Sequence, residues 1–331
     1  MKASVGWGVG VVGAVCLSLA SVASAVNIVT VPVGNPGNAD DTEGDGYGGV
    51  DYTYNIGKFE VTAGQYTDFL NAVADTDTYG LYNTYMDTAN DQFGCNIKRT
   101  GSAGSYTYNV ALDWADRPVN YVSWGDAARF CNWLENGQPI GAQGLSTTED
   151  GSYYLNGATS NAALLAVTRE ADATWVIPSE DEWYKAAYYD GASDVYYDYP
   201  TGTDATPSND LVGPDPGNNA TFYDSGYTIG SPYYRTEVGA HENSESPYDT
   251  FDQGGNVWEW NEAVIVGSYR GLRGGSVLDV DYDLHAADRY YDFYPSYEDN
   301  VIGFRVAEVP EPGTVGLLGL GMLAALRKRR K

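Results

Sequence analysis

Residues 254–260, GGNVWEW, place a single carboxylate between two tryptophans directly after a pair of glycines. Tryptophan is highly buried on average, and an unpaired carboxylate among buried indoles would be costly. Glu259 therefore needs a positive charge beside it. Two interpretations stay open from the residues: a metal cation, or an ion pair with an arginine such as Arg270 or Arg273.

The chain is strongly acidic. Its 331 residues include 45 Asp and Glu against 18 Lys and Arg, for a net charge of −27. Such a charge repels nucleic acid and anionic lipid, so we expect neither as a partner. The 29 tyrosines and 40 glycines indicate an exported, loop-rich globular protein. The run at residues 41–46 imitates half of an EF-hand loop, but Tyr52 stands where that loop needs a glutamate, so we expect a solvated acidic loop.

The N-terminal segment, residues 1–25, predicts an export signal. It contains Lys2, an apolar run and a small-x-small cleavage site at residues 23–25. We expect a signal peptide that is removed; a retained membrane helix is the alternative.

The C-terminal segment, residues 308–331, resembles the PEP-CTERM sorting signal. It contains Pro310, Glu311 and Pro312, followed by an apolar run and a basic tail. The resemblance implies processing by an exosortase and delivery to the envelope surface or the extracellular matrix. The apolar run at residues 314–326 is short for a full span, so we expect only a transient membrane anchor.

Between these signals, residues 26–307 are predicted to form one α+β domain. Three segments combine an apolar stripe at helical spacing with a capping box at the start; the boxes are Thr62 with Gln65, Ser123 with Asp126, and Ser179 with Glu182. Clusters of β-branched and aromatic residues predict short strands; they lie within residues 52–61, 106–112, 117–122 and 174–178. Residues 190–252 are rich in Gly, Pro, Asn and Asp, which predicts a long functional loop region.

Six motifs in order resemble the formylglycine-generating enzyme, or sulfatase-modifying-factor, family. They cover residues 58–307 and read FEVTAGQYTDFLNAV, PVNYVSWGDAARFCNWL, IPSEDEWYKAAYY, GGNVWEW, YRGLRGGS and NVIGFRVA. The resemblance implies a compact variant of the C-type lectin fold that is low in regular secondary structure and commonly holds calcium.

The resemblance also implies which residues would hold calcium. One site would use the side chains of Asp252 and Glu259 with the carbonyls of Gly255 and Val257. Carboxylate and carbonyl oxygens are the ligands that this hard cation takes.

A second calcium site would use Asn219 and the carbonyl of Ala220. Its remaining ligands should come from residues 230–234, but the expected aspartate is missing there.

Enzymes of the family oxidise a substrate cysteine with two active-site cysteines after the GGS motif, which hold copper(I) in the aerobic enzymes. Asp279 occupies the first of these positions, and no cysteine follows Cys131. A carboxylate replaces a thiolate neither in binding copper(I) nor in thiol exchange. We therefore expect no copper and no family oxidation. The remaining cysteines, Cys95 and Cys131, are expected either to pair or to be two separate buried thiols.

These features favour an exported, surface-sorted protein that binds polysaccharide or a matrix protein. The candidate cleft would be bordered by Asp279, Arg273, His285 and Arg289. The alternative is an enzyme, either an oxidase that works without cysteine or another reaction in the same cleft.

Overall fold

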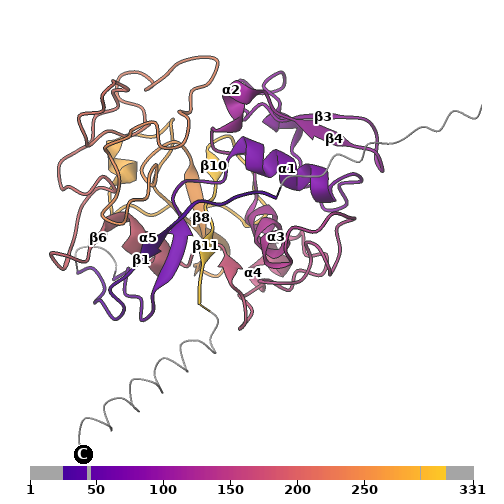
Figure 1. Ribbon diagram of the computed structural model, residues 1–331, viewed down its shortest axis with the longest axis horizontal. Coiled ribbons are helices and arrows are strands. Elements are labelled where there is room, and N and C mark those ends of the chain that lie inside the picture. The colour runs from indigo at the N-terminus through magenta and orange to yellow at the C-terminus, as the bar shows by residue number, and fades with distance from the viewer. Residues whose placement is uncertain (1–24, 43–45, 291, 311–331) are drawn as a thin grey trace, which may run out of the picture.

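The computed structural model describes residues 25–42, 46–290 and 292–310 (Figure 1). The predicted signal peptide, apart from Ala25, lies outside the described residues. Of the sorting motif, Pro310 is described, whereas Glu311 and Pro312 are not.

The three predicted helices are confirmed, and each begins at its predicted cap. They are α1 (Ala63–Val73), α3 (Trp124–Glu135) and α5 (Glu180–Tyr188). In each, the cap hydroxyl accepts from the backbone N–H three residues on, and that residue's side chain accepts from the cap N–H. Both bonds satisfy donors that a helix start otherwise leaves unpaired. The shorter helices are α2 (Leu112–Ala115), α4 (Asn161–Leu165), η1 (Thr84–Met86) and η2 (Asp281–Leu284).

Two small sheets form the centre of the domain. The first is antiparallel, in the order β1 (Thr30–Val33), β2 (Tyr54–Gly57), β11 (Ala307–Glu308), β5 (Trp175–Val176). In the second, β8 (Trp258–Ile265) lies between β10 (Ile302–Gly303), which is parallel to it, and β9 (Tyr269–Arg273), which is antiparallel. Two hairpins complete the set: β3 (Lys98–Thr100) with β4 (Thr107–Asn109), and β6 (Tyr189–Asp190) with β7 (Val195–Tyr196).

One predicted strand is absent from the structure. Residues 117–122 form no strand; only Pro118 makes an isolated bridge, to Thr62. Proline lacks an N–H for a ladder, and Tyr121 has φ of 58°, which breaks an extended run. The residues on either side of the predicted domain boundary, Ala307 and Glu308, both lie in β11, and the boundary itself stays a prediction.

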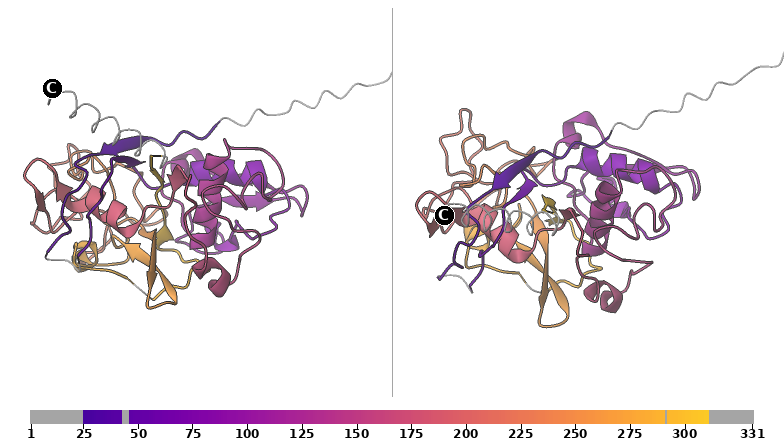
Figure 2. Two further views of the ribbon diagram at one scale, coloured as in Figure 1. Left: turned by 90° about the horizontal axis from the view of Figure 1, so that it is seen from below. Right: turned by 60° about the horizontal axis from the view of Figure 1, so that its bottom comes forward.

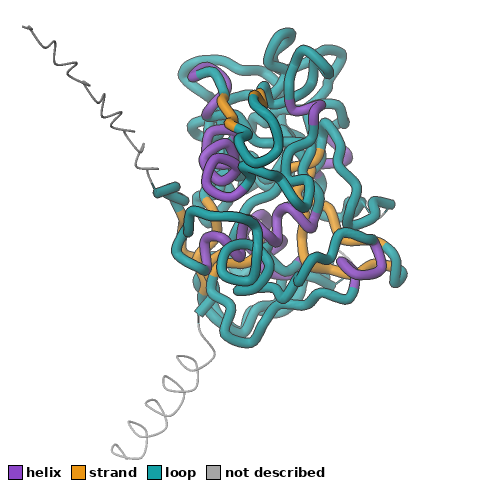
Figure 3. The backbone as a smooth tube through the Cα atoms, turned by 90° about the vertical axis from the view of Figure 1, so that its right-hand side faces the viewer, coloured by secondary structure: helices purple, strands orange, loops and turns teal. Residues whose placement is uncertain are grey.

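The elements divide into two sides around these sheets. Helices α1, α2 and α3 gather with the β3–β4 hairpin on one side, and long loops fill the other (Figure 1). The β8–β9 hairpin extends from the body of the domain (Figure 2). The predicted loop region, residues 190–252, contains β7, but no described helix or strand lies between β7 and β8, so the long loop is confirmed from residue 197 onward. Loop dominates the whole backbone trace, as expected for an α+β fold low in regular structure (Figure 3).

An aromatic cluster holds the helical side to the central sheets. Phe130 of α3 meets Phe69 of α1 edge-on at 5.3 Å and Phe304 at 5.4 Å between ring centroids, and Trp133 lies 5.2 Å from Phe69. Edge-on aromatic pairs contribute beyond the area that they bury. None of the helices within the described ranges is long and apolar enough to cross a membrane.

Candidate functional site

Glu259, the acid between the two tryptophans, forms a buried ion pair. Arg305 donates from Nε to Oε2 at 2.6 Å and from Nη2 to Oε1 at 2.7 Å, and the Trp183 indole donates to Oε2 at 2.7 Å. Arg305 also donates to the carbonyls of Gly57 and Phe251, each at 2.9 Å. Of the two interpretations open from the sequence, the structure contains the ion pair.

The partner is Arg305 and not the two arginines named from the sequence. Arg270 donates to the carbonyls of Leu164 and Val167, at 2.9 and 2.7 Å, and its guanidinium lies 3.8 Å from the Trp124 ring centroid. Arg273 pairs with Glu180 instead.

The glycines before Glu259 bring its strand close to a neighbouring loop. Gly255 has φ of 89°, and a Cβ there would lie 2.2 Å from the carbonyl oxygen of Thr221. Only glycine fits such a position without strain.

The predicted calcium ligands around Glu259 accept hydrogen bonds from the protein in this arrangement. Both Glu259 oxygens accept from N–H donors, and Asp252 Oδ2 accepts from the Gly239 N–H at 2.6 Å. Within the described ranges, no group of three or more His, Cys, Asp or Glu side chains is arranged to hold a metal. Calcium with Gly255 and Val257 as carbonyl ligands stays a prediction.

At the second predicted calcium site, a neighbouring aspartate takes the central position. The Asp215 carboxylate accepts from the Asn219 side-chain amide, the Gly217 and Asn243 N–H groups at 3.0 Å, and the Ser244 hydroxyl at 2.8 Å. Burial alone would raise the pKa of Asp215, but these hydrogen bonds hold it below its usual value.

Sequence reasoning missed Asp215 because it sought the aspartate in residues 230–234. The signal that could have found it is the turn-forming run DPGNN, residues 215–219, which precedes Ala220 directly. Calcium with Asn219 and Ala220 also stays a prediction.

Asp279, which the sequence resemblance places where the family has its first cysteine, is part of a hydrogen-bonded cluster. Its Oδ2 accepts from the Trp258 indole at 2.8 Å and from the Ser276 hydroxyl, and its backbone carbonyl accepts from the Tyr223 N–H at 2.8 Å. Burial raises the pKa of Asp279 above its ordinary value. This side chain supplies a carboxyl group and no redox chemistry.

Cys95 and Cys131 are buried and unpaired with each other, which confirms the separate-thiol alternative and not the disulfide. Burial raises the pKa of both thiols. A buried thiol with a raised pKa is a poor nucleophile and metal ligand, because the thiolate is the reactive form.

The four residues of the predicted cleft fall into three separate groups, one of which is the Asp279 cluster described above. Arg273 and Arg289 meet on Glu180, which accepts from Arg273 Nε at 2.9 Å and from Arg289 Nη2. His285 instead has Nε2 3.5 Å from Asp198 Oδ1, and its Nδ1 accepts from the Ala287 N–H at 3.0 Å.

Beside the Asp198–His285 contact lies the tyrosine pocket, a hollow of about 550 Å³. The β6–β7 hairpin and the segment before residue 43 form its walls. It is lined by Tyr189, Tyr196, Tyr197, Asp40, Asp41, Asp194, Asp198, Asp204, Ala39, Thr42 and Val195. None of these lining residues is a lysine or an arginine.

The sequence did not indicate that the N-terminal acids reach this pocket. Asp41, expected in a solvated loop, is only 8% exposed and accepts from the Tyr184 hydroxyl at 2.6 Å. The rest of the EF-hand-like run, residues 43–45, lies outside the described residues.

Comparison with known proteins gives two family matches. Residues 23–309 match the sulfatase-modifying factor enzyme 1-like domain, and residues 308–331 match the PEP-CTERM protein-sorting motif. No curated protein gives a significant match.

Similar solved structures include CarF and the Treponema denticola variable protein 1. CarF is 20% identical with a TM-score of 0.51, over 86% of this chain and 100% of CarF. The Treponema protein is 19% identical with a TM-score of 0.52, over 88% of this chain and 98% of that one. At these identities the likeness concerns the fold alone, and it confirms the predicted architecture.

Proposed function

This chain belongs to the sulfatase-modifying-factor family, and we propose that it serves as an exported carbohydrate-binding protein rather than as an oxidase. The sorting motif supports export and envelope sorting, with processing by an exosortase. The proposed ligand is a polysaccharide of the envelope or matrix, bound in the tyrosine pocket.

The observation that carries the proposal is the chemistry of that pocket. Aromatic faces pack on the C–H faces of sugar rings, and carboxylates accept hydrogen bonds from sugar hydroxyls. The pocket combines three tyrosines with five aspartates and has no lining cation. Because Asp40, Asp194 and Asp204 are exposed, their oxygens are accessible to a ligand.

Hydrogen bonds hold two of the three tyrosines, Tyr189 and Tyr196, in place. The Tyr196 hydroxyl donates to the Ala39 carbonyl at 2.9 Å and accepts from the Asn38 amide at 2.7 Å. The hydrogen bond from its hydroxyl to Asp194 raises the pKa of Tyr189 to about 12. Side chains fixed before binding lose little conformational entropy when a ligand docks.

The positions of the cysteines speak against an oxidase of this family. No cysteine follows Cys131, both mature-region thiols are buried, and the Asp279 carboxyl group is hydrogen-bonded within the protein. A reaction that passes through accessible thiolates therefore has no group to use.

Binding is tested with purified protein and envelope or extracellular polysaccharide, by pull-down and calorimetry. Tyr197→Ala removes a half-buried ring from the pocket lining and should weaken binding about two- to tenfold. The matched control is Tyr154→Ala, because Tyr154 is 51% exposed and does not line this pocket. Equal affinities for the two variants, or no retention of any polysaccharide, would count against the proposal.

The oxidase alternative is tested separately. Purified protein is incubated with a cysteine peptide of the sulfatase type, copper and oxygen, and the peptide is examined by mass spectrometry. We expect unchanged cysteine; an aldehyde product formed with turnover would overturn the non-catalytic part of the proposal.

A further inference from the structure

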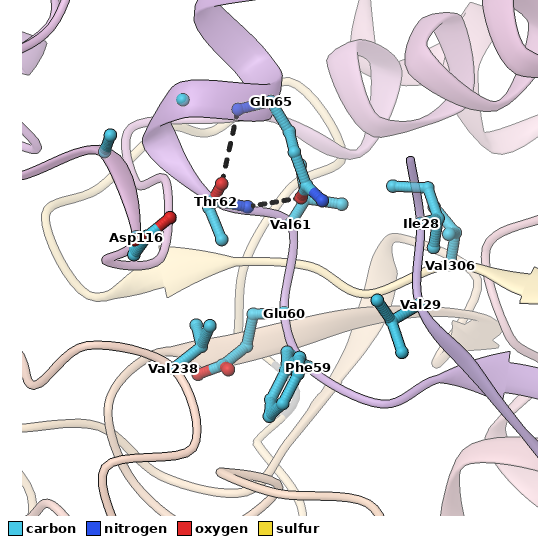
Figure 4. Close-up of a pocket in the computed structure, with 12 residues that line it drawn as sticks. Ile28, Val29, Phe59, Glu60, Val61, Thr62, Gln65, Asp116, Val238 and Val306 are labelled. Carbon is cyan, nitrogen blue, oxygen red and sulfur yellow. Dashed lines mark hydrogen bonds between the residues drawn. The ribbon is translucent and has the colours of Figure 1, made fainter. Parts of the chain in front are cut away.

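A second pocket, the Glu60 pocket, lies at the start of α1 and has a volume of about 350 Å³ (Figure 4). It shares no lining residue with the tyrosine pocket. Its walls are mainly aliphatic and aromatic, formed by Ile28, Val29, Phe59, Val61, Val238 and Val306. Glu60 and Asp116 are its acidic lining residues, and no lysine or arginine lines it.

Glu60 places a buried carboxyl group in this pocket without a hydrogen-bond partner in another described residue. It is 2% exposed, and neither carboxyl oxygen has a hydrogen-bond partner in another of the described residues. By contrast, the neighbouring Thr62 and Gln65 satisfy each other in the capping box. Figure 4 shows the Glu60 carboxyl group between Phe59 and Val238, which both line the pocket. Buried carboxyl groups without partners are costly, so such a group points to a missing donor.

The nearby charges do not supply that donor. Asp252 and Glu259 act on Glu60 with the same sign of charge, and burial raises the pKa of Glu60 well above its ordinary value. Arg305 is the nearby cation of opposite sign, but its guanidinium is bonded to Glu259 and to main-chain carbonyls. Lys58 donates no hydrogen bond to Glu60 either, and its ammonium lies 5.0 Å from the centroid of the Phe251 ring.

We propose that the Glu60 pocket binds an aliphatic cation: a primary ammonium group that donates to Glu60, on a stem of about four carbons that packs against the aliphatic walls. A charged donor makes a stronger hydrogen bond to a carboxyl group than a neutral donor does. The apolar walls match a methylene stem, which is how lysine-like groups bury their length. The net charge of −27 also favours the approach of a cation.

The test uses n-butylammonium as the probe and butan-1-ol as its neutral counterpart, with calorimetry on the purified protein. We expect the ammonium ion to bind at least about tenfold more tightly than the alcohol, because the alcohol makes no charge-assisted hydrogen bond. Equal affinities, or no binding of the ammonium ion, would overturn the proposal.

Two variants place the probe in this pocket. Glu60→Gln should weaken n-butylammonium at least about tenfold, whereas Glu237→Gln should change its affinity less than about twofold. Glu237 is the matched control because its side chain is 58% exposed and does not line the pocket. Val238→Phe, which fills the pocket at a half-buried position, should abolish binding even where Glu60→Gln fails to fold. If Val238→Phe still bound n-butylammonium with unchanged affinity, the assignment of this ligand to the Glu60 pocket would be overturned.

The source of the cation is distinguished by a second ligand. N-acetyl-lysine methylamide that competes with n-butylammonium would identify a lysine side chain of a polypeptide as the occupant. Binding of n-butylammonium without such competition would identify a free alkylamine. Because the two pockets share no lining residue, failure of this test leaves the carbohydrate proposal standing, and the reverse also holds.

Discussion

Replacing Arg305 with methionine should destabilise the protein more than any ordinary surface change. The side chains of Arg305 and Glu259 are 0% and 1% exposed, so their ion pair is fully removed from water. Arg305→Met leaves the Glu259 carboxylate with the Trp183 indole as its remaining donor. It also removes the donors to the Gly57 and Phe251 carbonyls.

The expected loss is about 3–5 kcal/mol in the free energy of unfolding, the range found when one partner of a buried pair is removed. Domains have about 5–15 kcal/mol in total, so the variant should be close to unfolding. The double variant Glu259→Gln with Arg305→Met removes the uncompensated charge as well. It should therefore recover about 1 kcal/mol or more relative to Arg305→Met alone.

Urea denaturation followed by tryptophan fluorescence measures these differences. The matched control is Arg289→Met, because Arg289 is 20% exposed and its partner Glu180 keeps Arg273. That control should cost about 1 kcal/mol or less. A loss for Arg305→Met no larger than that of the control would refute the reasoning.

The same experiment separates the ion pair from a calcium site. A calcium ion bound to Glu259 would raise the apparent stability, because a ligand of the folded state stabilises that state. A denaturation midpoint that a chelator leaves unchanged would mean that Arg305 alone neutralises Glu259. A midpoint that falls on adding the chelator and returns with calcium would restore the metal.

Three other predictions follow from buried groups. Cys95 and Cys131 should resist a thiol reagent in the folded protein and react only in urea, and a reductant should leave the melting temperature unchanged, as calorimetry can check. Burial raises the pKa of Glu298 from 4.5 to about 8, so the folded state keeps a proton that the unfolded chain releases. Stability should therefore fall as pH rises from 4.5 to 8, and less steeply in Glu298→Gln, as urea denaturation at several pH values can show. Ser123→Ala removes the cap hydroxyl that accepts from the Asp126 N–H at 3.1 Å, and should cost about 1 kcal/mol in the same assay.

The helix starts could be predicted because their determinants are local. Thr62, Ser123 and Ser179 each act on a backbone N–H three residues away, so the whole interaction is visible in four letters of sequence. The six ordered motifs likewise indicated the fold, because they extend over most of the domain.

The partner of Glu259 could not be predicted in the same way. Arg305 follows it by 46 residues, and Arg270 and Arg273 are nearer in sequence and equally basic. Choosing among them requires knowing that β10 lies parallel to β8 and brings the following segment alongside. Asp215 was missed for a related reason, since its partners Asn243 and Ser244 follow it by 28 and 29 residues in the same long loop.

The buried arginines help to explain how a fold with so few helices and strands pairs its backbone carbonyls. Loop carbonyls that no strand pairs still need donors, and a guanidinium offers five N–H groups in a fixed geometry. Arg270 serves the carbonyls of Leu164 and Val167, and Arg273 serves those of Ala286 and Asp288. Arginine side chains therefore supply in this domain some of the hydrogen bonds to backbone carbonyls that sheet ladders supply in other folds.

This use of arginine also determines the character of the surface. Arg235, Arg270, Arg273 and Arg305 are all buried, so a chain with only 18 lysines and arginines has fewer left to balance its 45 acids outside. The tyrosine pocket and the Glu60 pocket are each lined by acids without a lysine or an arginine. Such hollows favour ligands that donate hydrogen bonds, either the hydroxyls of a sugar or an ammonium group, over anionic ligands. The binding chemistry proposed for both pockets is thus a consequence of how the fold satisfies its own backbone.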